Sequence, residues 1–106
     1  MNLNDWAKEV HEVAVDKGWW DGDRDFGALI ALVHCELSEA YEEYRHNKPA
    51  YYTESGKPEG IGVELVDALI RILDTLATLD VDIDELMRIK TDFNKTRAYR
   101  HGGLKS

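Results

Sequence analysis

The chain has 106 residues, a single cysteine and a formal net charge of −8. This length suits one domain with its own hydrophobic core, so residues 1–106 are interpreted as a single domain. One cysteine, Cys35, excludes an intramolecular disulfide, and no apolar run approaches the roughly 18–20 residues of a membrane span. The first residues also do not resemble a secretory signal. A cytoplasmic protein with no membrane partner is expected.

The charge is unevenly distributed along the chain. Residues 88–106 carry a net charge of +5, whereas residues 1–87 carry −13. An acidic body of this kind repels the phosphates of long nucleic acids, which are therefore excluded as partners. A short basic segment beside an acidic body suits a small phosphorylated ligand better. The alternative is a solvated basic tail that binds nothing.

Four helical segments are predicted, at about residues 4–18, 25–46, 60–79 and 82–97, with no convincing strand, so the predicted fold class is all-α. In the first, Trp6, Val10 and Val13 form a stripe of helical period that ends at Gly18. The turn-like cluster Asp21-Gly22-Asp23 supplies a candidate N-cap for the second. Residues 48–60 contain both prolines and are predicted to form a loop.

The third helical segment is apolar on nearly every side. Its polar exceptions, Glu64, Asp67, Arg71 and Asp74, fall on a single stripe. Such a helix is expected at the centre of a bundle or at a subunit interface. The fourth segment begins at Asp82, which resembles the N-cap of a capping box.

Two pairs of acidic residues interrupt the apolar stretches of the second and third segments: Glu36 with Glu39, and Glu64 with Asp67. A spacing of i, i+3 places each pair on one helix face. Burying four ionised carboxylates is costly unless positive charge compensates them, and a divalent metal ion would do so. Ligands that are all oxygen favour Mg²⁺, with Mn²⁺ possible. The alternative is that these carboxylates pair with lysines or arginines of other helices.

A di-iron site is a further alternative, because such bundles use Glu-x-x-His on two helices. Glu43 and His46 show this spacing once, at the end of the second segment and without a counterpart. His11 and His34 are interpreted as residues at the edge of the core. The di-iron alternative is therefore disfavoured.

The C-terminal stretch combines cationic donors with an amide. Lys90, Asn94 and Arg97 share one helical face. Arginine and lysine bind phosphate oxygens, and asparagine can hydrogen-bond a sugar or a base. The alternative is a fraying helix end whose cations face the negative end of the helix dipole.

These features together resemble the MazG-like, all-α nucleoside triphosphate pyrophosphatases, in a short single-domain branch. The resemblance covers about residues 10–105. It rests on E-x-x-E followed after 24 residues by E-x-x-D, and on the segments Gly18-Trp19-Trp20, Lys57-Pro-Glu-Gly-Ile and Lys90…Asn94-Lys95-Thr-Arg97…His101-Gly-Gly. The chain departs from the branch at Gly102-Gly-Leu-Lys105, where Gly-Gly-Lys is more usual, so no role is given to Lys105.

The resemblance implies a four-helix MazG-like fold whose bundle is completed by homo-oligomerisation, as a homodimer or homotetramer. It implies that the four acids bind Mg²⁺ and that a nucleoside triphosphate is hydrolysed to the monophosphate and pyrophosphate. A carboxylate that the metal does not saturate could act as the general base, and Glu39 is the candidate chosen for this role. The expected substrate-binding residues are Lys90, Lys95 and Arg97 at the phosphates, Asn94 and Tyr99 near the sugar or base, and Trp19 or Trp20 stacked on the base or packed in the core. Two alternatives stay open: a non-catalytic metal- or nucleotide-sensing module, and a structural dimerisation domain.

Overall fold

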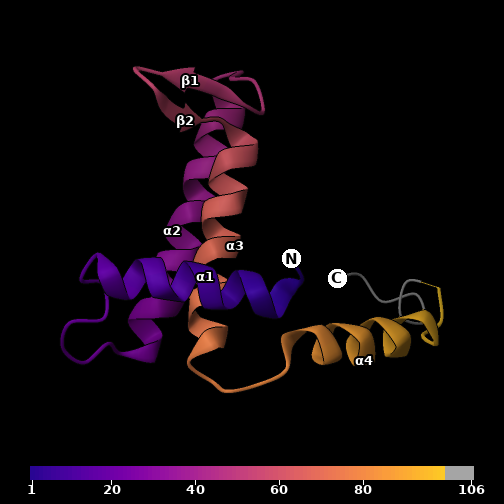
Figure 1. The fold of residues 1–106 in the computed structure, drawn as a ribbon. Coiled ribbons are helices and arrows are strands. Elements are labelled where there is room, and N and C mark those ends of the chain that lie inside the picture. Colours follow the sequence, from indigo (N-terminus) through magenta and orange to yellow (C-terminus); the bar gives the residue numbers. More distant parts are fainter. Residues whose placement is uncertain (100–106) are drawn as a thin grey trace.

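The computed structural model describes residues 1–99 and is mostly helical (Figure 1). Its elements are α1 (Leu3–Asp16), α2 (Phe26–Arg45), β1 (Tyr52–Glu54), β2 (Lys57–Glu59), α3 (Ile61–Ala77) and α4 (Ile83–Lys95). The four predicted helices are confirmed, each end within two residues of its expected position. His101, Gly102 and Gly103, which contribute to the family resemblance, and Lys105, where the chain departs from it, lie outside the described residues.

Short side chains fix where the helices begin. Asn2 and Asp5 form a reciprocal capping box at the start of α1, and Gly18 follows its C-cap with φ of 84°. The predicted cap of α4 is confirmed, since the Asp82 side chain accepts from the N–H of Glu85. The predicted cap of α2 is wrong. Its N-cap is Asp25, because only the residue directly before the helix can reach the free N–H groups of the first turn.

The prediction of a strand-free loop at residues 48–60 is also wrong, because β1 and β2 form a short antiparallel hairpin there. The two turn residues, Ser55 and Gly56, both have positive φ, as a two-residue type I′ hairpin turn requires. Strands of three residues are too short to show an alternating pattern. Pro58 is tolerated because each strand is an edge strand.

Gly60 joins the hairpin to α3 and cannot be replaced without strain. Its φ is 121°, and a Cβ atom at this position would lie 2.4 Å from the main-chain oxygen of Ala50. The N–H of Gly62 also donates to this oxygen. This close approach places the hairpin beside the first turn of α3, where Glu64 lies.

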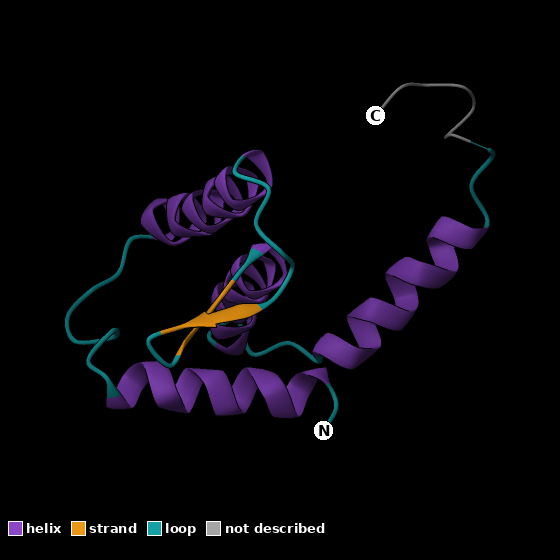
Figure 2. Ribbon diagram, turned by 90° about the horizontal axis from the view of Figure 1, so that it is seen from above, coloured by secondary structure: helices purple, strands orange, loops and turns teal. Residues whose placement is uncertain are grey.

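Helices α2 and α3 run side by side, and α1 crosses them at the end away from the hairpin (Figures 1 and 2). The core lies where α1, α3 and the start of α4 meet. Its buried members are Ala7, Leu73 and Ile83, with Leu3, Val10, Leu76 and Ala77 packed around them. Among residues 1–99, no helix combines the length and apolar character needed to cross a membrane.

One chain does not cover the apolar surface of α3. The helix packs against both α1 and α2, as expected of a central helix, yet Leu65, Leu69 and Ile72 each stay 41–49 % exposed. Helix α2 shows a matching exposed stripe at helical spacing. Its members are Phe26, Ile30, Leu37, Tyr41 and Tyr44.

Candidate metal centre and adjoining pocket

Three of the four predicted acids converge between α2 and α3. One carboxylate oxygen each from Glu36, Glu64 and Asp67 lies within 4.8 Å of the others. Glu36 is buried at 8 % exposure, whereas Glu64 and Asp67 are only half-buried and Glu39 is exposed. The expectation that all four carboxylates are buried is therefore wrong, because the acid pairs lie along the edge of the α2–α3 contact.

The fourth acid, Glu39, joins the site through Glu64. Burial, a hydrogen bond with Glu39 and the nearby negative charges raise the pKa of Glu64 from its ordinary 4.5 to about 7. Burial and the Glu36 carboxylate also raise the pKa of Asp67, opposed by the cations of Arg71 and Lys57. Near neutral pH the site is therefore crowded with negative charge, and a cation bound there would favour the ionised forms.

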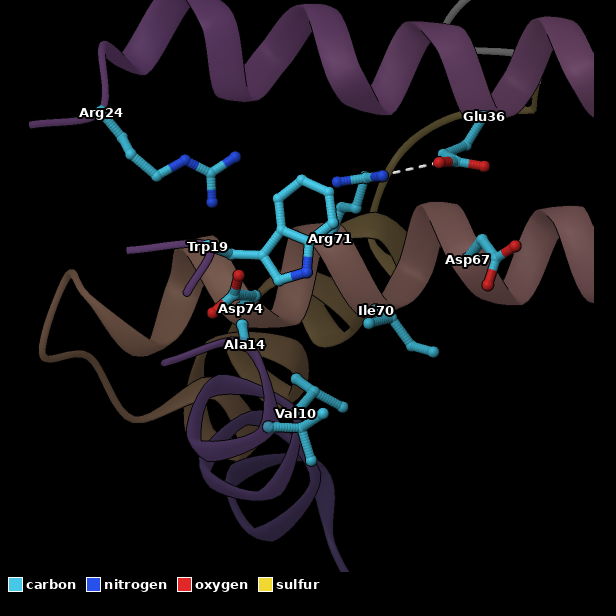
Figure 3. A pocket seen from close by; sticks show the side chains of 10 residues that line it. Val10, Ala14, Trp19, Arg24, Glu36, Asp67, Ile70, Arg71 and Asp74 are labelled. Carbon is cyan, nitrogen blue, oxygen red and sulfur yellow. Dashed lines mark hydrogen bonds and ion pairs between the residues drawn. The ribbon is translucent and has the colours of Figure 1, made fainter. Parts of the chain in front are cut away.

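The alternative interpretation, in which the acids pair with basic residues of other helices, holds for one carboxylate oxygen of Glu36. The Nε of Arg71 on α3 donates to its Oε1 over 2.8 Å (Figure 3). Glu36 retains a second oxygen for other ligands. Arg71 therefore holds α2 against α3 next to the acid cluster without occupying every carboxylate oxygen.

The donor set fits a hard divalent cation. All candidate ligands are carboxylate oxygens, and two oxygens on opposite sides of a Mg²⁺ ion are about 4 Å apart, given Mg–O distances of about 2.0–2.1 Å. The observed spread of up to 4.8 Å is close to this separation and needs only small side-chain adjustments. The cluster is thus suited to Mg²⁺ or Mn²⁺ on chemical grounds.

A pocket of about 270 Å³ adjoins the acid cluster (Figure 3). Glu36 and Asp67 form its boundary with the cluster, and Val10, Val13, Ala14 and Ile70 supply an apolar wall. Trp19 also lines the pocket, with the Arg71 guanidinium 5.7 Å from the ring centre. The guanidinium of Arg24 also lines the pocket. An exposed aromatic ring, two guanidiniums and an apolar wall are thus combined next to carboxylates.

The two tryptophans have different surroundings. Trp19 is 55 % exposed, whereas the Trp20 indole N–H donates to both carboxylate oxygens of Asp74, at 3.0 and 3.1 Å. The Nδ1 of His11 lies 2.7 Å from Asp74 Oδ1, and Arg24 covers the Trp20 ring at 4.7 Å. Trp20 is therefore held in a polar cluster that joins the 17–25 segment and α1 to α3.

Sequence reasoning missed this cluster, although it placed Asp74 on the polar stripe of the third segment. We expect Asp74→Ala to lower the free energy of unfolding by about 2 kcal/mol, because the buried carboxylate that accepts from Trp20 and contacts His11 is lost and the half-buried Trp20 N–H loses its acceptor. Denaturant unfolding measures this. Asp23→Ala, an exposed acid outside any helix, is the control and should change stability by less than about 0.5 kcal/mol. Equal effects from the two variants would contradict this role of Asp74.

A second group of acids lies beside the first, and it too was missed. Oxygens of Glu43, Glu59 and Glu64 lie within 4.8 Å of one another. Glu59 reaches this position only because the unpredicted hairpin folds back onto α3. His46, the partner of Glu43 in the di-iron alternative, is exposed, and its ring contacts the main-chain oxygen of Glu42.

The predicted substrate-binding residues of the C-terminal stretch do not join the acids within one chain. Helix α4 projects away from the α2–α3 pair (Figures 1 and 2). All five predicted residues are exposed: Lys90, Asn94, Lys95, Arg97 and Tyr99. The structure therefore brings Glu36, Glu39, Glu64, Asp67 and Trp19 to one region and leaves the basic face elsewhere.

Compared with protein-family models, curated proteins and solved structures, the chain matches none.

The pKa of Glu64 makes stability depend on pH. The folded protein holds this proton up to about pH 7, whereas the unfolded chain releases it near its ordinary pKa of 4.5. The protonated Glu64 side chain therefore contributes its full stabilisation below the unfolded pKa of 4.5, and this contribution is lost as the pH rises through the folded pKa of about 7. We expect the Tm of the wild type, relative to Glu64→Gln, to fall between about pH 5 and pH 8. Thermal unfolding of both proteins across this pH range measures the difference. A Tm difference that does not change with pH would contradict the prediction.

Proposed function

We propose that the protein is a Mg²⁺-dependent nucleoside triphosphate pyrophosphohydrolase of the MazG-like type, which converts a (deoxy)nucleoside triphosphate and water into the monophosphate and pyrophosphate. The observation that carries this proposal is the convergence of Glu36, Glu64 and Asp67 beside a pocket with an exposed aromatic ring and two guanidiniums. The sequence resemblance supplies the reaction type, and the donor chemistry supplies the cation.

Some of the acids would bind the cation, and one would accept a proton. Glu36, Glu64 and Asp67 would hold the cation, which when bound neutralises triphosphate charge and lowers the pKa of a water molecule. Glu39 contacts Glu64 but is not one of the three acids whose oxygens converge, so its carboxylate would stay free to receive the proton of the attacking water. Glu39, the exposed member, is the expected general base.

The adjoining pocket suits a nucleoside. Trp19 offers an exposed ring for stacking on a base, while Trp20 is occupied by Asp74. Of the two tryptophans named from the sequence, Trp19 is therefore the expected stacking partner. Arg24 and Arg71 lie where a sugar or phosphate between base and metal would pass.

The half-exposed apolar stripes of α2 and α3 support an assembly. Leu69 and Ile72 lie on one side of α3, and Tyr41 lies on the exposed stripe of α2. Pairing such surfaces with those of a second copy would complete a bundle, so we propose a homodimer or homotetramer that acts in the cytoplasm.

The deciding experiment is a screen of standard and modified nucleoside triphosphates for pyrophosphate release with Mg²⁺. Release of pyrophosphate and monophosphate that stops when the metal is chelated would support the proposal. Nucleotide-dependent thermal stabilisation without turnover would favour the sensing module instead. An absence of both would favour a structural dimerisation domain.

A further inference from the structure

The first turn of α4 is fixed to the beginning of α1. The N–H groups of Leu3 and Asn4 donate to the Asp84 carboxylate at 3.0 and 3.2 Å. In return, the Asn4 side chain accepts from the N–H of Ile83 at 2.8 Å and donates to Asp82 at 2.9 Å. Ile83 itself is buried in the core at 6 % exposure. The direction in which α4 leaves the core is therefore set by several contacts.

Beyond this turn, α4 carries an unusual exposed face. Leu86, Lys90 and Phe93 share it, at spacings of i, i+4 and i+7, and Arg97 follows two residues after the end of the helix. The ammonium of Lys90 lies 5.2 Å and the guanidinium of Arg97 5.9 Å from the centre of the Phe93 ring. A surface that packs on the exposed Phe93 side chain would therefore also contact the positive charges of Lys90 and Arg97.

The acid flank of α2 and α3 has the complementary charge. Besides the metal cluster, it carries a groove of about 270 Å³ lined by Glu39, Glu42, Glu43 and Glu64, together with His46 and Lys48. From Arg88 to Tyr99, by contrast, α4 and the residues after it hold four basic residues and one acid. Opposite charges of this density favour association of the two surfaces.

We infer that the basic face at the end of α4, made of Lys90 and Phe93 on the helix and Arg97 just after it, completes the acid site of a second copy of this chain rather than that of its own chain. Turning α4 back onto its own α2–α3 flank would break its contacts with Leu3 and Asn4 and remove Ile83 from the core. A second copy can present α4 without this loss. The contact of Lys90 and Arg97 with substrate rests on the proposed function. The docking of α4 on a second copy does not depend on that function.

Subunit mixing tests the substrate contact. Asp67→Asn inactivates the acid site, and Lys90→Ala/Arg97→Ala should lower kcat/KM roughly tenfold or more by removing two phosphate ligands. When the two variants are mixed in equal amounts and allowed to exchange subunits, half of the dimers are mixed, and each of these holds one intact site. Activity should return to about one quarter of wild type.

The matched control mixes Asp67→Asn with Glu64→Gln, where every dimer has a defect in both acid sites and no activity returns. Mixed dimers are verified by mass spectrometry. If they form but the first mixture stays inactive, α4 serves its own chain and the inference is overturned. Full activity of Lys90→Ala/Arg97→Ala alone would also overturn it.

Crosslinking tests the docking without an activity measurement. Cys35 is exposed and precedes Glu39 by one helical turn, so Asn94→Cys should join Cys35 of a second chain through a short thiol–thiol reagent. The expected product has twice the 12.1-kDa chain mass. Wild type and Cys35→Ser/Asn94→Cys are the controls. A covalent dimer specific to the thiol pair supports the inference even if no nucleotide is hydrolysed, and its absence overturns it.

Discussion

Asp67→Asn should lower the rate of pyrophosphate release by at least about 100-fold, the loss expected when a group that organises transition-state charge is removed. The fold should persist, because Asp67 is half-buried among other carboxylates and its pKa is already raised by burial and by Glu36. Glu36→Gln, Glu39→Gln and Glu64→Gln should have similar effects on turnover. Steady-state kinetics with Mg²⁺, together with circular dichroism, measures both parts of the prediction.

The structure distinguishes these four variants in stability. Glu64→Gln mimics the protonated side chain and should unfold no more easily than wild type at pH 7. Glu36→Gln weakens the contact with Arg71 and should be the least stable. Glu9→Gln, an exposed member of an E-x-x-E pair on α1, is the matched control and should retain full activity. Two of the four site variants within a few-fold of wild type would show that the metal site is assigned wrongly.

Leu69→Glu should separate the assembly into monomers. The Leu69 side chain is 45 % exposed in one chain, so glutamate there leaves the isolated chain folded but places a charge in the proposed apolar contact. Ile72→Glu, at 41 % exposure, should act in the same way. Sedimentation at micromolar concentration measures the mass, and circular dichroism shows whether the helices persist.

Leu79→Glu is the control for this prediction, because Leu79 is 52 % exposed but lies in the turn after the end of α3. It should leave the mass unchanged. A wild-type monomer of about 12.1 kDa that still hydrolyses nucleotide would rule out the shared bundle.

The helices could be predicted from the sequence because each has a long periodic pattern, and for α4 the capping residue Asp82 also marks the start. The β-hairpin could not, since three-residue strands leave no periodic signal and the turn depends on positive φ at Ser55 and Gly56. Convergence of Glu36 with Glu64 and Asp67 followed from their spacing and apolar context. That interpretation could not foresee that Arg71 would bond to Glu36, because pairing across helices depends on their relative rotation.

The same limit applies to Asp74 and to α4. Asp74 appeared only as one more polar residue of a stripe, and its partners, His11 and Trp20, are 63 and 54 residues away along the chain. The placement of α4 depends on hydrogen bonds between its first turn and the first turn of α1. Periodicity describes which side of a helix is apolar, but it contains no information about where the helix points.

The contact between the first turns of α1 and α4 also bears on how the chain acquires its shape. Its hydrogen bonds join residues 78 to 81 positions apart, so they close the longest loops of any side-chain hydrogen bonds among residues 1–99. Closing such a loop costs more conformational entropy than forming the neighbouring α2–α3 contact. During synthesis, residues 2–4 emerge well before Asp84 and must wait for it before this contact can form. The direction of α4 is therefore expected to be among the last features established, after the acid cluster has already assembled.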